Sequence, residues 1–143
     1  MRLTERFLHG DPPTRAELGE ASASVQALLP DLEVAKAVGV AGTIAQLAEL
    51  ARTDELTVAE IENQLGGLAA LPVADRRRVP RLDPERAPVI VAGALIVREV
   101  LRRYGLDRLR YSVHDLLDGV ALEAAKLPVA AEGDAPPGAY TCC

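Results

Sequence analysis

An uninterrupted apolar run, Val89–Val97, is the feature that most limits how this chain can fold. The run carries no polar side chain on any face, which is typical of a helix buried on every side. It is far shorter than the roughly 20 residues that cross a bilayer as a helix. The chain must therefore surround this helix with other apolar elements, and we expect no membrane partner.

The composition fits one domain with a real core. The chain has 143 residues, 49% of them hydrophobic but only 3% aromatic, so its core must be built from Ala, Val, Leu and Ile. No apolar signal-peptide region follows the N-terminus. Cys142 and Cys143 are neighbours at the C-terminus, where they can neither staple a fold nor make a good metal site. These features predict a cytoplasmic protein.

Helix starts are marked by capping residues. Thr14 with Glu17 and Thr57 with Glu60 form two capping boxes, and the first of these helices should reach about Leu29. The other expected elements follow in chain order. They are a strand over 32–40, a helix over 44–50, a short helix over 75–79, a helix from Asp83-Pro84 with a kink or fresh start at Pro88 and a left-handed cap at Gly105, a strand over 109–113 and a helix over 115–126. The pattern predicts a helix-rich α/β fold with about two strands and five or more helices, and a disordered tail over 128–143.

A glycine turn between a strand and a helix is the first candidate site. It reads Val38-Gly39-Val40-Ala41-Gly42-Thr43. Two glycines let the backbone approach an anion closely, and the helix start presents unpaired N–H groups. The turn fits neither the Walker pattern nor the dinucleotide fingerprint. We interpret Gly39, Gly42 and Thr43 as phosphate-binding, with a plain structural turn as the alternative.

The second candidate is Tyr111-Ser112-Val113-His114-Asp115, again at the end of a strand and the start of a helix. Ser112 or Asp115 could cap that helix, and His114 could contact a ligand. A structural role for a lone histidine stays open. No residues form a nucleophilic triad or a zinc-ligand spacing.

Positive charge gathers between Arg76 and Arg110, where ten arginines face four acidic residues in a chain of net charge −5. Arginine forks match phosphate oxygens, so the stretch could serve a polyanionic ligand. Alternatively, these arginines coat the solvent faces of helices.

Five motifs occur in order along the chain: 2–7, 11–13, 39–43, 86 with 91–95, and Ser112-x-His114-Asp115-x3-Gly119. Together they resemble the C-terminal half of the core of the exopolyphosphatase/guanosine pentaphosphate phosphohydrolase (Ppx/GppA) family. The resemblance covers about residues 2–127.

The resemblance implies the actin-like ATPase superfold, with two lobes of ribonuclease-H-like topology and an active site in the cleft between them. Residues 1–127 would be the later part of the second lobe. Gly39–Thr43 would lie where relatives contact nucleotide or phosphate, and Ser112–Asp115 would close the rim of the cleft. Such enzymes release terminal phosphate from polyphosphate or guanosine pentaphosphate, using Mg²⁺, a carboxylate base and glycine-rich phosphate loops.

The departures from the family pattern are equally informative. An Asp-x-Gly-Ser-type loop and an Asp-Ile-Gly-Gly-Gly-Ser-type loop, both typical of the family, do not occur in the sequence. Phosphoryl transfer requires positioning and charge neutralisation from both sides of the phosphate. We therefore expect a fragment without catalytic residues or metal ligands of its own, and Mg²⁺ only in the complete enzyme.

The expected partners are polyphosphate or guanosine pentaphosphate, together with the missing first lobe or further copies of the chain, and not nucleic acid. Two alternatives to a truncated hydrolase stay open. One is a non-catalytic phosphate- or nucleotide-binding or interaction module that docks on a separately encoded first lobe. The other is a decaying gene product without a function.

Overall fold

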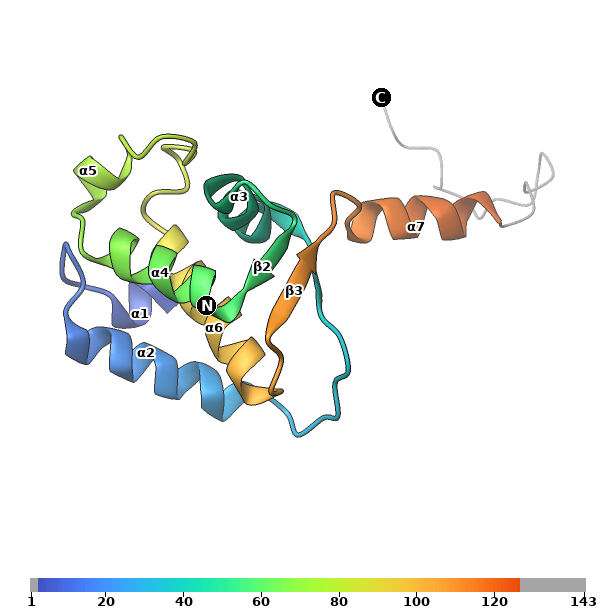
Figure 1. Ribbon diagram of the computed structural model, residues 1–143, viewed down its shortest axis with the longest axis horizontal. Coiled ribbons are helices and arrows are strands. Elements are labelled where there is room, and N and C mark those ends of the chain that lie inside the picture. Colours follow the sequence, from blue (N-terminus) through green and yellow to red (C-terminus); the bar gives the residue numbers. More distant parts are fainter. Residues whose placement is uncertain (1–2, 127–143) are drawn as a thin grey trace, which may run out of the picture. The chain divides into compact units, whose positions relative to one another are not determined.

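The computed structural model describes residues 3–126, which form seven helices and one three-stranded sheet (Figure 1). A first compact unit ends at Val113, and a second begins at His114. The helices are α1 (Leu3–Phe7), α2 (Arg15–Leu28), α3 (Ala41–Ala51), α4 (Val58–Ala69), α5 (Val73–Arg76), α6 (Ile90–Arg103) and α7 (Leu116–Ala125), and the strands are β1 (Val38–Gly39), β2 (Glu55–Thr57) and β3 (Arg108–Tyr111).

Both predicted capping boxes are present. The Thr14 hydroxyl accepts a hydrogen bond from Glu17 N at 3.3 Å, and the Glu17 carboxylate accepts one from Thr14 N at 2.7 Å. Thr57 and Glu60 repeat the arrangement at the start of α4. The capping side chains satisfy backbone N–H groups that the first helical turn leaves unpaired, which is why the sequence pattern located α2 and α4 well.

Helix α6 lies at the centre of the first unit, packed against α2 and α4 (Figure 1). It begins at Ile90, after a series of turns that contains Pro88, so the predicted fresh start is confirmed. The apolar run is buried or half-buried except at Ile96, which is 40% exposed. The sequence predicts that other apolar elements surround this run, and in the structure the neighbouring helices α2 and α4 cover most of it.

The sheet has the order β1-β3-β2. β1 pairs parallel to β3 with Val38 opposite Arg110, and β2 pairs antiparallel to β3 with Leu56 opposite Leu109. The sequence predicted β3 within a residue or two, but it predicted β1 much too long and missed β2. A short strand such as Glu55-Leu56-Thr57 has too few residues to show a period-2 pattern.

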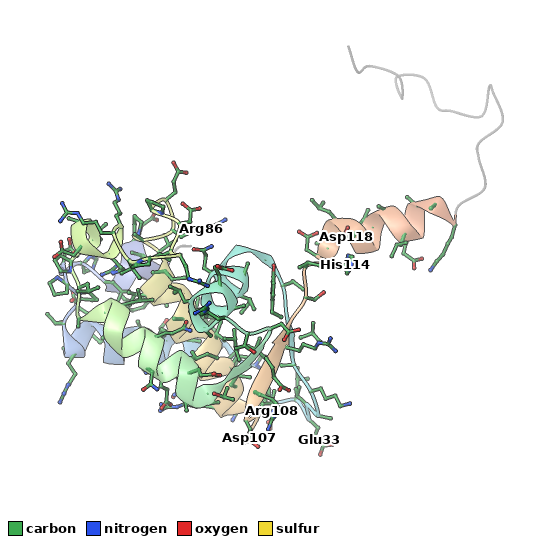
Figure 2. All side chains as sticks on the ribbon, turned by 45° about the horizontal axis from the view of Figure 1, so that its top comes forward. Glu33, Arg86, Asp107, Arg108, His114 and Asp118 are labelled. Atoms are coloured by element: carbon green, nitrogen blue, oxygen red, sulfur yellow. The ribbon has the colours of Figure 1, made fainter. Side chains whose placement is uncertain are left out.

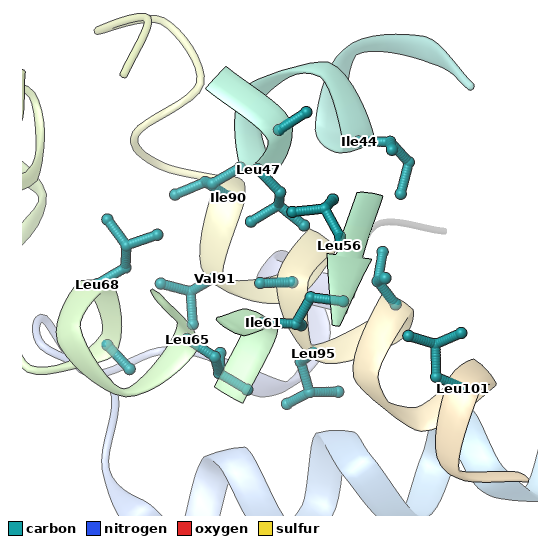
Figure 3. Packing of buried hydrophobic residues seen from close by; sticks show 14 of the residues in the cluster. Ile44, Leu47, Leu56, Ile61, Leu65, Leu68, Ile90, Val91, Leu95 and Leu101 are labelled. Carbon is teal, nitrogen blue, oxygen red and sulfur yellow. The ribbon is translucent and has the colours of Figure 1, made fainter. Parts of the chain in front are cut away.

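A single core in the first unit joins α2, α3, α4 and α6 to one face of the sheet (Figure 3). Its largest fully buried apolar side chains are Leu47, Leu56, Ile61, Ile90, Val91, Leu95 and Leu101. One charged group, Glu99 of α6, is also fully buried. Burial by itself would raise the pKa of Glu99, but its carboxylate accepts hydrogen bonds from Gln26 and Arg98, and the pKa is lowered as a result. The resulting cluster ties α2 to α6.

The connection between α4 and α6 depends on a buried arginine. The guanidinium of Arg76 donates hydrogen bonds to the carbonyl oxygens of Leu68, Leu71 and Ala87. The short helix α5 ends at Arg76, a few residues earlier than predicted. It also begins earlier, because Pro72 stands directly before its first residue, Val73. Burial lowers the pKa of Arg76, and the charge of Asp11 opposes that shift.

The second unit contains α7, which begins where the sequence predicted. Asp115 caps it by accepting a hydrogen bond from Leu117 N at 2.8 Å. Within the described part of the chain, no helix is long and apolar enough to span a membrane. The predicted tail, 128–143, lies outside the described residues.

Candidate functional site

The backbone turns sharply between β1 and α3. Val40, the residue before the helix, is extended at φ −130°, whereas Ala41 adopts a left-handed φ of 66°. A left-handed conformation is unfavourable for a residue with a Cβ atom, so the surrounding packing must hold it. No side chain caps the helix at Val40. The first N–H groups of α3 are therefore left without a capping side chain, as at helix termini that bind anions.

Gly39 is a glycine because of packing. A Cβ atom at this position would lie 2.8 Å from Ile44 Cγ2 and 3.0 Å from Leu109 Cδ1, closer than side chains allow. The carbonyl of Gly39 accepts a hydrogen bond from Ser112 N at 2.9 Å, which joins the ends of β1 and β3. Gly39 thus fixes where the turn begins, and the predicted contact between Gly39 and a phosphate is not tested by this geometry.

Gly42 lies in the first turn of α3, directly against Arg86. A Cβ atom on Gly42 would lie 2.6 Å from Arg86 Nη2 and 2.7 Å from its Cζ. Figure 2 shows Arg86 on the segment that precedes α6. The absence of a side chain at Gly42 lets a guanidinium approach the start of the helix, so two sources of positive potential lie side by side.

Arg86 was not among the predicted binding residues, although it stands within one of the five motifs. Most arginines between Arg76 and Arg110 have acidic partners, among them Arg78 with Asp75 at 3.4 Å and Arg81 with Glu49 at 3.5 Å. Arg86 is exposed, and its guanidinium has no ion-pair partner among residues 3–126. The sequence signal that could have identified it is its position shortly before the buried helix, within one of the five motifs.

Thr43 points toward α6. Its Cγ2 and Oγ1 atoms would lie 2.6 and 2.9 Å from a Cβ atom on Gly93, so the threonine side chain packs where Gly93 has none. The observed role of the Thr43 side chain is close packing of α3 against α6. The backbone N–H of Thr43 remains in the first turn of the helix, where it could face an anion.

The other predicted ligand residues divide between the two units. Ser112 follows β3 in the first unit, where its backbone N–H donates to the Gly39 carbonyl. His114 and Asp115 belong to the second unit. His114 Nδ1 lies 3.7 Å from Asp118 Oδ2, and the Asp115 carboxylate caps α7. The capping role foreseen for Asp115 is confirmed, whereas ligand contacts by Ser112, His114 and Asp115 stay predictions.

A metal centre is not assembled within residues 3–126, where no group of three or more His, Cys, Asp or Glu side chains is placed to hold an ion. The donors in that range do not fit a magnesium site, so none of these side chains is assigned to holding Mg²⁺. What the first unit offers is a positively polarised wall made of the start of α3 and Arg86.

The chain belongs to the Ppx/GppA phosphatase family, whose model matches residues 1–127. It is 35% identical to exopolyphosphatase 2 of Mycobacterium tuberculosis, over 87% of this chain and 46% of that protein. It is 30% identical to exopolyphosphatase 1 of Mycobacterium leprae, over 94% of this chain and 44% of that protein.

The solved structures agree with this assignment. The type II variant of the Aquifex aeolicus Ppx/GppA phosphatase superimposes with a TM-score of 0.80 at 29% identity, covering 85% of this chain and 45% of that one. The predicted family and its actin-like fold class are thereby confirmed. The chain spans a little less than half the length of the relatives that it matches.

Proposed function

We propose that this chain forms one wall of the phosphate site of an exopolyphosphatase-type hydrolase. The complete protein would release terminal phosphate from polyphosphate or from guanosine pentaphosphate. The family membership supports the reaction class, and the names of the Mycobacterium relatives support polyphosphate as a substrate to be tested.

The observation that carries the proposal is the contact between Arg86 and Gly42 at the start of α3. A phosphoanhydride loses its terminal phosphoryl group through a transition state whose charge spreads over the peripheral oxygens. Backbone N–H groups at a helix start and a guanidinium fork both stabilise such charge without having to reorganise. Arg86, which lacks an acidic partner among the described residues, would supply its full charge to that task.

This wall lacks metal ligands, so we do not expect it to catalyse phosphoryl transfer alone. Residues 3–126 hold no cluster of metal ligands, and phosphoryl transfer requires charge neutralisation on both sides of the reacting phosphate. We expect Mg²⁺ and a carboxylate base to be supplied outside this chain. The purified 143-residue chain should therefore release no phosphate above the buffer rate with Mg²⁺ and either substrate.

A chimera tests the proposed function directly. The matched region of M. tuberculosis exopolyphosphatase 2 is replaced by this chain, and phosphate release from polyphosphate and from guanosine pentaphosphate is measured. We expect the chimera to be active and Arg86→Ala to reduce kcat at least about tenfold, as loss of one charge-stabilising donor does. Arg77→Ala, at another exposed arginine, is the matched control and should leave the rate unchanged.

Contrary results are equally definite. An active chimera that is indifferent to both Arg86→Ala and Gly42→Val would show that the turn does not contact the reacting phosphate. Mg²⁺-dependent release by the 143-residue chain alone would contradict the expectation that the catalytic groups lie elsewhere. Ser112→Ala and His114→Ala in the same chimera test two of the other predicted ligand residues.

A further inference from the structure

One face of α3 contacts the segment that leads into α6 (Figure 1). Gly42, Gln46 and Glu49 are four and three residues apart, so they lie in a row along this face. The order of the contacts along the segment is opposite to the order along the helix. Gly42 lies against Arg86, Gln46 contacts Asp83 and Glu49 contacts Arg81. The row therefore determines which residue of the segment reaches the start of α3.

The middle contact of the row is the strongest. The backbone N–H of Asp83 donates a hydrogen bond to Gln46 Oε1 at 2.7 Å. Arg81 Nη1 lies 3.5 Å from Glu49 Oε1, but both side chains are exposed, and exposed ion pairs contribute little. In the described part of the chain, the hydrogen bond of Gln46 is the only one that joins the turn 83–86 to α3.

The turn that carries Arg86 is closed by its own backbone. Arg86 N donates a hydrogen bond to the carbonyl of Asp83 at 2.9 Å. Leu82 before the turn and Ala87 after it are buried, whereas the four residues between them are exposed. A closed turn moves as a unit, so a hydrogen bond that holds Asp83 also holds the backbone from which the Arg86 side chain extends.

We propose that Gln46 is a positioning residue for the candidate phosphate wall, because it keeps the Arg86 guanidinium beside Gly42 before an anion binds. An arginine on a turn that is not held must be ordered when the anion binds, and the entropy lost in ordering it lowers the affinity. Gln46 acts through Arg86 and is not itself a ligand. The inference rests on the proposed function, since the position of Arg86 affects phosphate only if the two are in contact.

Gln46→Leu in the 143-residue chain tests the proposal. Leucine has a similar size but no acceptor, and water can pair with the exposed Asp83 N–H, so the fold should be retained. Pyrophosphate is titrated into labelled protein at low salt, and the amide shifts of Gly42 and Thr43 are followed by NMR. We expect about three- to tenfold weaker binding, which corresponds to ordering one long side chain.

A second readout does not involve a ligand. The NMR order parameter of the Arg86 Nε–H bond should be lower in Gln46→Leu than in the original chain, because the turn is no longer held to α3. Gln46→Ala removes the same acceptor and favours the helix, so it should give the same two results and excludes an effect of leucine itself. Glu49→Gln should change the pyrophosphate affinity by less than about twofold.

A double-mutant cycle shows whether Gln46 acts through Arg86. The variant that combines Gln46→Leu with Arg86→Ala should bind pyrophosphate as weakly as Arg86→Ala alone. Gln64→Leu is the matched control, because the Gln64 side chain also donates a hydrogen bond to α3, at 3.0 Å from the carbonyl of the buried Leu47. It should leave the pyrophosphate affinity and the order of Arg86 unchanged.

Two results would overturn the proposal. The first is an unchanged pyrophosphate affinity, or an unchanged order parameter of Arg86, in a Gln46→Leu variant that is folded at the temperature of the titration. The second is a double variant in which the two losses of affinity multiply, because Gln46 would then act independently of Arg86. If the original chain binds no pyrophosphate at the turn, the proposed function fails instead, and the order parameter still decides whether Gln46 holds Arg86.

Discussion

The Thr43 side chain of α3 lies over the Cα atom of Gly93 in α6, so closely that a Cβ atom on Gly93 would be 2.6 Å from Thr43 Cγ2. This contact links the turn that starts α3 to the central helix of the core. The position of the candidate phosphate wall therefore depends on how closely two helices approach each other. A mutation at Gly93 should therefore shift Thr43 and with it the turn that starts α3.

Gly93→Ala should destabilise the fold by about 1–3 kcal/mol, because it forces a methyl group into the Thr43 side chain. Adding Thr43→Ala should recover part of that loss, with a coupling energy of about 1 kcal/mol in a double-mutant cycle. Urea denaturation of the original chain, the two single variants and the double variant measures this coupling energy. The control is Gly67→Ala in α4, which meets no atom within 4 Å and should stabilise by up to about 1 kcal/mol. Additive effects of the two mutations would refute the contact.

The backbone of Ala41 provides a second test of the turn. With a φ of 66°, this residue occupies a conformation that glycine adopts without a steric penalty. Ala41→Gly should therefore stabilise the chain by roughly 0.5–1 kcal/mol. Ala45→Gly, one helical turn later in α3, should destabilise it by about the same amount. If both changes destabilise equally, Ala41 does not have a left-handed conformation in solution.

How far the sequence predicted this fold depends on the kind of signal each element carries. Capping residues such as Thr14, Thr57 and Asp115 act within one helical turn, so their helices were located correctly. Leu56 belongs to a strand only through its pairing with Leu109, which is distant in sequence. The segment 32–40 resembles a strand locally, but the length of its ladder depends on its neighbours.

The site shows the same division between local and distant signals. Gly39, Gly42 and Thr43 were chosen from a turn pattern, and the structure gives each a packing contact that the pattern does not reveal. The contacts of Gly42 with Arg86 and of Thr43 with Gly93 join positions more than forty residues apart. Helical or strand periodicity in the sequence cannot predict contacts between positions so far apart. Family resemblance could place the turn near a phosphate, but only the fold reveals Arg86 beside it.

The capping box of α2 should give stability a defined dependence on pH. Hydrogen bonds from the backbone N–H of Thr14, and then of Gly10, lower the pKa of the Glu17 carboxyl from 4.5 to about 2. The pKa of this carboxyl is lower in the folded state than in the unfolded state, so the ionised carboxylate stabilises the fold. That stabilisation is complete above about pH 5. That effect is lost as the pH falls from about 4.5 to about 2.

Glu17→Gln should therefore be less stable than the original chain at pH 7, and the difference should shrink toward zero near pH 2. Urea denaturation at a series of pH values measures that difference. Glu20→Gln, on the same helix and exposed, is the control and should show no such trend. A stability difference that is independent of pH between 5 and 2 would mean that Glu17 does not cap α2.

Arg76 should be hard to replace even by lysine. Its guanidinium satisfies three backbone carbonyls at 2.7–2.9 Å, and one ammonium group cannot reach all of them. Arg76→Lys should cost roughly 3 kcal/mol or more, since buried carbonyls are left unpaired. The neighbouring change Arg77→Lys is at an exposed residue and should lie within about 0.5 kcal/mol of zero. Thermal or urea unfolding of both variants gives the comparison, and equal stabilities would contradict the buried role of Arg76.

The central claim, that the start of α3 and Arg86 form a phosphate-binding wall, is tested most directly by titrating pyrophosphate into isotopically labelled chain and following amide shifts by NMR. We expect saturable shifts centred on Ala41, Gly42 and Thr43, with millimolar affinity, or about −4 kcal/mol. Gly42→Val and Arg86→Ala should abolish or weaken them, Arg77→Ala should not, and salt above about 0.2 M should reduce them. Shifts spread over the other exposed arginines, or shifts at the turn that survive Arg86→Ala and Gly42→Val unchanged, would contradict the claim.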